Sequence, residues 1–183
     1  MLTHKGTQLI ETPRLILRRA VKEDAAAMLR NWASDPEVTK YLTWPAHEDL
    51  ATTQWVIASW LREYENDDFY QWMIVPKELG QPIGTISVVD QNDNIEKCEI
   101  GYCIGRPWWH HGYTSESLAA VIRFFFEEVG MNRIEAAHDT NNPNSGLVMK
   151  KCGMRFEGIA RSAARNNQGI CDISRYAILR SDR

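Results

Sequence analysis

The sequence predicts an α+β fold around one mixed, mostly antiparallel sheet of about seven strands, flanked by about four helices. Three observations lead to this prediction. Strand-like and helical segments follow one another in the order β, α, α, β, β, β, α, β, α, β, β. One helix connects two strand-like segments, which is how parallel neighbours are joined. The length of 183 residues suits one well-buried core, so we expect a single domain over residues 1–183.

The first half of the chain predicts a strand, two helices and a hairpin. Apolar residues recur with spacing i, i+3, i+4, i+7 in both helical segments, and Asp35-Pro36 ends the first one. Gly80 lies in the connection of the hairpin, whose second strand leads to a polar turn. The expected elements are a strand at 15–18, helices at 25–32 and about 48–64, strands at 69–75 and 83–89, and a turn at 91–94.

The second half alternates strands and helices before a final pair of strands. In the strand at 98–105, Ile100, Tyr102 and Ile104 share one face, and Glu99, Gly101 and Cys103 share the other. Glycine weakens a strand, so Gly101 and Gly105 indicate a bulge or a close backbone approach. The remaining elements are helices at 114–128 and 143–151, followed by Gly130 and Gly153, and strands at 133–138, 155–161 and 170–179.

The junction at residues 109–116, Trp-His-His-Gly-Tyr-Thr-Ser-Glu, lies where a strand-like run ends and a helix begins. The first turn of a helix has unpartnered backbone N–H groups and partial positive charge, so the junction suits a phosphate. Gly112 permits backbone conformations closed to other residues and a close approach of a ligand. The alternative is an ordinary helix cap made by Thr114 or Ser115.

Composition and charge argue against several classes of protein. The net charge is −3 and no Lys/Arg cluster is present, which disfavours nucleic acid as a partner. The chain shows neither the apolar core of a signal peptide nor a run near the ~18 apolar residues of a membrane span, so we expect a cytoplasmic protein without membrane contact. Four cysteines without Cys-x-x-Cys spacing and five histidines without His-Glu-x-x-His predict free thiols and no metal site.

The junction and three later segments together resemble the GNAT superfamily of acetyl-CoA-dependent N-acetyltransferases. The later segments are Asn-Pro-Asn-Ser at 142–145, Lys-Cys-Gly-Met at 151–154 and Phe-Glu-Gly at 156–158. The pyrophosphate loop of the family reads Gln/Arg-x-x-Gly-x-Gly/Ala, and only Gly112 matches it strictly. Glu-Thr-Pro-Arg-Leu-Ile-Leu-Arg at 11–18 is similar to the branch of ribosomal-protein N-terminal acetyltransferases. The resemblance extends from Glu11 to about Leu179.

This resemblance implies a sheet that splays after the fourth strand, where acetyl-CoA binds as co-substrate. The pantetheine arm would pair with the backbone of residues 102–104, and the pyrophosphate would lie on residues 109–115. Asn142 would close the far side through its amide, although it could instead only cap the helix that opens at Pro143. The candidates for binding acetyl-CoA are Tyr102, Cys103, Ile104, Trp109, His110, His111, Gly112, Tyr113, Thr114, Ser115, Asn142 and Ser145.

Acetyl transfer needs a neutral amine, a polarised thioester carbonyl and a proton for the leaving thiolate. A backbone N–H near Cys103 or Ile104 could stabilise the developing oxyanion. Glu99 is the candidate general base, directly or through a water, and its alternative is a solvated or ion-paired strand residue. Glu116 fits a structural role better, because a carboxylate in the first turn is favoured by the helix dipole.

The candidate general acid differs from the commoner family pattern, which has a tyrosine where this chain has Met149. The ribosomal branch carries a serine three residues after the asparagine, and Ser145 takes that place. Ser145 could alternatively be a small residue that lets its helix approach the cofactor. Tyr176, on the last strand, is a second candidate acid.

The resemblance to the ribosomal branch implies an α-amine acceptor at a protein or peptide N-terminus, such as that of a ribosomal protein. An α-amine has a pKa of about 7.7–8.0, so a modest base suffices. Amino acids, polyamines and aminoglycosides stay open as acceptors, since Trp44, Trp55, Trp60 and Trp108 would suit a small-molecule pocket. A non-catalytic acyl-CoA sensor, a nucleotide-binding enzyme and a cysteine acyltransferase using Cys152 are rival functions, and the chain could act as a monomer or a homodimer.

Overall fold

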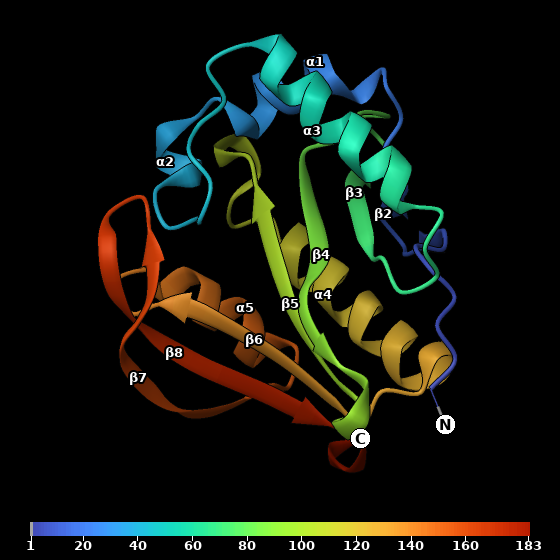
Figure 1. Ribbon diagram of the computed structural model, residues 1–183, viewed down its shortest axis with the longest axis vertical. Helices are drawn as coiled ribbons and strands as arrows, with labels where there is room; N and C mark the ends of the chain where they lie inside the picture. The colour runs from blue at the N-terminus through green and yellow to red at the C-terminus, as the bar shows by residue number, and fades with distance from the viewer. Residues whose placement is uncertain (1) are drawn as a thin grey trace.

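The computed structural model describes residues 2–183 and is built around one eight-stranded sheet in the order β1-β2-β3-β4-β5-β6-β8-β7 (Figure 1). Every pair of neighbours that the structure describes is antiparallel except β5 and β6, which run parallel. The strands are β1 (Ile10–Glu11), β2 (Leu15–Arg18), β3 (Gln71–Pro76), β4 (Gly84–Asn92), β5 (Lys97–Ile104), β6 (Arg133–Asp139), β7 (Arg155–Asn166) and β8 (Gly169–Leu179). The helices are α1 (Asp24–Met28), α2 (Pro36–Thr39), α3 (Leu50–Glu63), α4 (Tyr113–Phe124) and α5 (Pro143–Lys151).

The predicted class and chain order are confirmed, with one more strand and one more helix than expected. The extra strand β1 has two residues, too few to show a periodicity. The extra helix α2 starts at the Asp35-Pro36 pair that was expected only to end a helix. The Asp35 side chain accepts a hydrogen bond from the Glu37 N–H (3.0 Å), and Pro36 occupies the first helical position. Both are favourable features of a helix start.

The expected splay is present between β5 and β6. The two strands pair only through Lys97–Glu99 and Arg133–Glu135, and beyond these residues they diverge (Figure 1). The bulge lies in β4, between Val88 and Asp90, rather than in β5. Gly101 instead permits a close approach, since a Cβ there would lie 2.7 Å from a Val89 methyl group. Splaying exposes the β5 backbone that would otherwise pair with β6.

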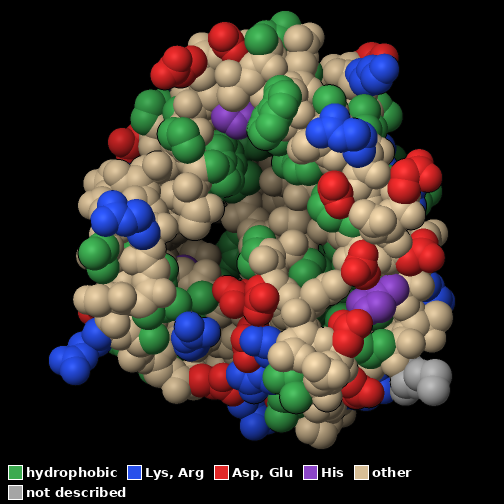
Figure 2. Space-filling model, in the orientation of Figure 1, with side chains coloured by type: hydrophobic (Ala, Val, Ile, Leu, Met, Phe, Trp, Pro, Cys, Tyr) green, Lys and Arg blue, Asp and Glu red, His purple; other side chains and the backbone are tan. Residues whose placement is uncertain are grey.

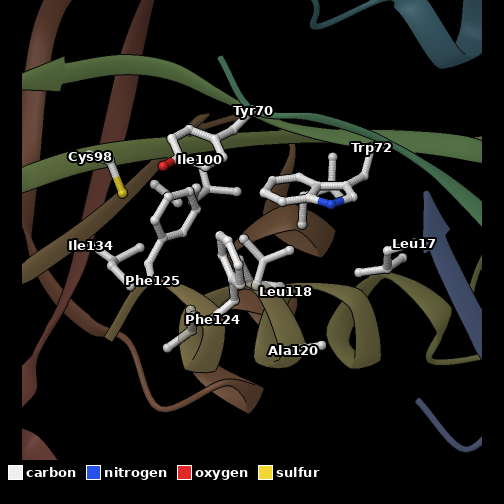
Figure 3. Packing of buried hydrophobic residues seen from close by; sticks show 14 of the residues in the cluster. Leu17, Tyr70, Trp72, Cys98, Ile100, Leu118, Ala120, Phe124, Phe125 and Ile134 are labelled. Atoms are coloured by element: carbon white, nitrogen blue, oxygen red, sulfur yellow. The ribbon is translucent and has the colours of Figure 1, made fainter. Parts of the chain in front are cut away.

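Both faces of the sheet are covered, which explains why all six residues of β3 are buried. Helices α4 and α5 lie behind the sheet in Figure 1, and α1 and α3 lie toward its upper front. On the α4 face, Tyr70, just before β3, and Trp72 of β3 meet the end of α4 and the turn after it (Figure 3), and the rings of Tyr70 and Phe125 are 4.8 Å apart. Such edge-to-face pairs add to the stability gained from burial. On the opposite face, Met73 packs in a second cluster with Trp32 and Ile57.

No helix within residues 2–183 combines the length and the apolar character that a membrane crossing requires.

Candidate active site

A cleft of about 510 Å³ opens where β5 and β6 separate. Its walls come from the end of β5, the loop that leads into α4, the first turn of α4, helix α5 and residues 37–42. Figure 2 shows the molecule hollowed between its helical upper part and the side that carries the β7–β8 hairpin. Ten of the twelve candidates for binding acetyl-CoA line this cleft: Tyr102, Cys103, Ile104, Trp109, His110, Gly112, Thr114, Ser115, Asn142 and Ser145. The other two, His111 and Tyr113, lie outside its lining.

The backbone of β5 turns alternate residues toward β4 and toward the open side. The Gly105 N–H donates to the Ile83 carbonyl of the β4 side (2.9 Å), and Cys103 stands opposite Thr85 in the same ladder. Because the pattern alternates, the N–H groups of Tyr102 and Ile104 face the splay. The N–H of Cys103 is therefore part of the ladder, which leaves Ile104 as the better oxyanion candidate of the two named from the sequence.

The loop before α4 is tightly turned. His110 and Gly112 both adopt left-handed backbone conformations, with φ of 64° and 80°. Gly112 occupies the N-cap position and no side chain caps the helix; the Ser115 hydroxyl instead donates to the Gly112 carbonyl (3.0 Å). The cap expected from Thr114 or Ser115 is thus absent from this helix start. The N–H groups of the first turn remain suited to an anion.

Two cationic side chains that were not predicted from the sequence lie beside Gly112. A Cβ on Gly112 would be 3.4 Å from Arg14 Nη2 and 3.8 Å from Lys151 Nζ. Lys151 lines the cleft from the last turn of α5, and Arg14 donates to the His111 carbonyl (3.0 Å). The first turn of α4 and Lys151 together form a positively polarised end of the cleft.

Glu116 ties the N-terminal segment to the start of α4. Its carboxylate accepts hydrogen bonds from the Thr12 hydroxyl (2.6 Å), the Arg14 N–H (3.0 Å) and Arg14 Nε (2.7 Å). Burial alone would raise the pKa of Glu116, but these hydrogen bonds hold it below its ordinary value. The contacts agree with the structural role expected for Glu116. They also give a physical reason for the Thr-Pro-Arg sequence at residues 12–14, which holds the start of α4 in place.

The start of α5 brings two of the proposed polar residues to the cleft. Asn142 precedes the helix, but its side chain makes no capping hydrogen bond, so its amide is not used as a cap. The Tyr102 hydroxyl lies 3.0 Å from both the carbonyl oxygen and the Oγ of Ser145. Burial raises the pKa of Tyr102 above its ordinary value. Met149 is only 1% exposed and belongs to the hydrophobic core.

Glu99 and Tyr176, two proposed catalytic residues, lie away from the main cleft. They border a second cavity of about 30 Å³, together with charged residues that include Arg133, Glu135 and Arg175. Burial raises the pKa of Glu99 most, and the negative charge of Glu135 raises it further. This change brings Glu99 closer to the working range of a base. Neither Glu99 nor Tyr176 is among the residues that line the main cleft.

The turn between β7 and β8 is joined to the segment before α3. The Asn167 side chain donates to the carbonyls of Thr39 (2.8 Å) and Trp44 (2.8 Å), and its N–H donates to the Leu42 carbonyl (3.2 Å). Because residues 37–42 line the cleft, this bridge fixes one of its walls. Of the four tryptophans proposed for a small-molecule pocket, Trp108 alone lines the cleft, and Trp55 is 69% exposed.

Within residues 2–183, no three His, Cys, Asp or Glu side chains come close enough together to hold a metal ion.

Comparison with known proteins agrees with this geometry. The family model of the acetyltransferase (GNAT) domain matches residues 14–155. An uncharacterized N-acetyltransferase of Bacillus subtilis, YoaA, is 30% identical over 172 residues, which cover 94% of this chain and 97% of that protein. The [ribosomal protein uS5]-alanine N-acetyltransferase of Escherichia coli is 34% identical over 64 residues, about a third of each chain (35% and 33%).

A solved structure shares the fold over almost its whole length. The GNAT-family acetyltransferase from Bacillus anthracis superposes with a TM-score of 0.82 at 25% identity, covering 94% of this chain and 98% of that one. The family match spans more than half of the chain, and the splayed sheet agrees with it. This chain therefore belongs to the GNAT family of acetyltransferases and is an N-acetyltransferase of that type.

Proposed function

We propose that this enzyme transfers the acetyl group of acetyl-CoA directly to the α-amine of a protein or peptide N-terminus, such as that of a ribosomal protein. The observation that carries the proposal is that three kinds of group line one cleft. They are the uncapped first turn of α4 beside Lys151, the open backbone edge of β5, and the Ser145 hydroxyl. These groups suit, respectively, a pyrophosphate, a chain of amides and a reactive thioester.

The residues of the cleft fit each part of acetyl-CoA. The N–H groups of residues 113–115 and the Lys151 ammonium would hold the phosphates. The exposed backbone groups around Tyr102 and Ile104 would pair with the pantetheine amides, and the Asn142 amide would contact the arm from α5. The indole of Trp109 donates to the Ile104 carbonyl (2.8 Å), so the N–H of Ile104 is the group left for a carbonyl oxygen.

Acetyl-CoA supplies an activated acyl group, and the protein has to stabilise charge and move protons. The Ile104 N–H would donate to the carbonyl oxygen as negative charge develops there. Ser145 would give the departing sulfur a proton from its hydroxyl. Glu99 would accept a proton from the amine through a water, which its raised pKa favours.

The α-amine acceptor is supported by the N-terminal segment 11–18, which is similar to the ribosomal branch, and by the relationship to the uS5-alanine N-acetyltransferase. An α-amine is also partly neutral near pH 7, because its pKa is about 7.7–8.0. Deprotonation of an α-amine therefore demands less of a base that acts through water than deprotonation of a lysine side chain, whose pKa is about 10.4.

The experiment offers peptides with ribosomal-protein N-termini in competition with a polyamine, an aminoglycoside and free amino acids, and ranks them by kcat/KM. A peptide with a blocked N-terminus and an internal lysine is the control. The proposal expects the free N-terminal peptides to be preferred and the blocked peptide to stay unmodified. Preference for a small amine would contradict the acceptor assignment and leave the acetyltransferase assignment in place.

A further inference from the structure

We propose that Tyr102 is a positioning residue that sets the hydroxyl of Ser145 to donate its proton to the departing sulfur. This inference rests on the proposed acetyl transfer, in which Ser145 is the general acid, and assigns a second residue that orients it. The two side chains come from different elements, β5 and α5, and both line the main cleft. Their contact thus spans the two walls that the splay separates.

The geometry brings one phenol against both oxygens of Ser145. The Tyr102 hydroxyl lies 3.0 Å from the Ser145 carbonyl oxygen and 3.0 Å from Ser145 Oγ. The ring of Tyr102 packs against the hydrophobic core, which limits its movement. Met149, one turn further along α5, has no proton to donate and is buried in the same core. The phenol of Tyr102 is thus a hydroxyl that can donate a hydrogen bond to Ser145 Oγ.

The single proton of the phenol can be placed in two ways. If it goes to the Ser145 carbonyl, the Ser145 hydroxyl donates to the phenol oxygen and its own proton is turned away from the cleft. If the phenol instead donates to Ser145 Oγ, the Ser145 proton is free to point into the cleft. A hydrogen bond donated to a hydroxyl oxygen also strengthens the next bond that this hydroxyl donates. Only the second arrangement suits an acid.

Burial raises the pKa of Tyr102, so the phenol keeps its proton throughout the neutral and mildly alkaline range. This proton can therefore be shared with Ser145 whenever the amine is neutral enough to react. Without the phenol, Ser145 would be an isolated hydroxyl, free to rotate and to donate to any nearby acceptor. The pair therefore accounts for how a serine could serve in place of a stronger acid.

The protons and electrons of the step balance. The amine nitrogen forms a bond to the carbonyl carbon, and the carbon–sulfur bond breaks with its electron pair remaining on sulfur. Sulfur takes the Ser145 proton while the phenol of Tyr102 keeps its own proton and donates a hydrogen bond to Ser145 Oγ. The proton released by the amine nitrogen passes through water to Glu99, and Ser145 then regains a proton from water as Glu99 releases one to it. One proton thus passes in net from nitrogen to sulfur, and the Ser145 hydroxyl is regenerated.

The test measures kcat and the KM for acetyl-CoA for the parent, Tyr102→Phe, Ser145→Ala and the double variant. Loss of an acid–base group costs about 10²–10⁴ in rate, and we expect Tyr102→Phe to lose about tenfold to a hundredfold in kcat because it acts through Ser145. Its KM for acetyl-CoA should stay within twofold. The double variant should be no slower than Ser145→Ala within twofold, because residues that act as one unit are not additive.

Tyr70→Phe is the matched control. It also removes a buried phenol hydroxyl, which contacts His4 Nδ1 (2.9 Å) and is not part of the cleft lining, and should lower the melting temperature while leaving kcat unchanged. The inference is overturned if Tyr102→Phe keeps kcat within twofold of the parent, or if the rate losses of the two single variants multiply in the double variant. It is also overturned if the lower rate of Tyr102→Phe is fully explained by a smaller folded fraction or by weaker acetyl-CoA binding. If the parent acetylates no amine at all, the proposed function and this inference both fall.

Discussion

Replacing Glu116 with alanine should destabilise the protein by about 2 kcal/mol, because three hydrogen bonds between α4 and residues 12–14 are lost together. The hydrogen bonds from the Thr12 hydroxyl and the Arg14 N–H are accepted by a Glu116 side chain that is only 18% exposed. In the variant, water replaces part of each bond, so the net loss is about 1 kcal/mol for each. The Arg14 side chain is 48% exposed, so its ion pair with Glu116 adds no more than about 0.5 kcal/mol.

Urea denaturation measures this difference directly, and the melting temperature should fall by about 4–8 °C for a chain of this length. Glu128→Ala is the control, because Glu128 forms an ion pair with Lys5 at the surface. The Glu128 side chain is 54% exposed and the Lys5 side chain is 40% exposed. That pair should contribute about 0.5 kcal/mol or less. A Glu116→Ala variant as stable as Glu128→Ala would refute the view that residues 12–14 hold the start of α4.

The same contacts set a pH dependence. The folded state lowers the pKa of Glu116, so its contribution is complete above the ordinary carboxyl value and is lost as the pH falls through the lowered value. The difference in unfolding free energy between the parent and Glu116→Gln should therefore be largest near neutral pH and shrink below about pH 4. A difference that grows on acidification would contradict this sign.

Three further predictions concern the cleft. Lys151→Ala should weaken acetyl-CoA binding about tenfold and leave kcat nearly unchanged. Lys150→Ala is the control and should leave binding unchanged, because Lys150 is one residue away and outside the cleft lining. Equal effects of the two variants in a calorimetric titration would exclude the Lys151 contact. Asn167→Ala should raise the KM for the acceptor and leave the KM for acetyl-CoA within twofold, because the Asn167 side chain bridges to Thr39 and Trp44. Gln168→Ala is the control, since Gln168 is exposed and makes no such bridge. An unchanged KM for the acceptor would argue against the bridge as a wall of the acceptor site. In the parent, kcat should rise with pH through the raised pKa of Glu99, and Glu99→Gln should remove that limb of the pH–rate profile; an unchanged profile would exclude Glu99 as the base.

The sequence predicted those features that local patterns determine. The alternation at 98–105 correctly separated Ile100 and Ile104, which pack in the α4-side core, from Cys103, which packs against the opposite cluster. The helix predicted at 114–128 was also correct, since α4 (Tyr113–Phe124) is continued by a π-helical turn to Val129 and a helical period survives in any surroundings. The extra elements β1 and α2, by contrast, are too short to carry a period.

Features of the site that depend on long-range contacts were not accessible from spacing. Lys151 comes from the far end of α5 to Gly112, and Asn167 bridges 123 to 128 positions along the chain. Glu99 and Tyr176 were selected for their chemistry and their strands, but the sheet directs them to a smaller, separate cavity. Which cavity a strand residue faces depends on the packing of its neighbours, and no local signal encodes that.

Binding of coenzyme A to the cleft tests the account most directly. Calorimetric titration should give one site per chain for the parent protein, and a thermal shift equivalent to about 2.7 kcal/mol at a hundred times the dissociation constant. In Gly112→Trp, a bulky side chain would stand on a left-handed residue beside Arg14 and Lys151, and binding should fall by at least about a hundredfold, or about 2.8 kcal/mol. Circular dichroism confirms that the variant is folded. Equal affinity of a folded Gly112→Trp and the parent would contradict the assignment of this loop to the phosphates.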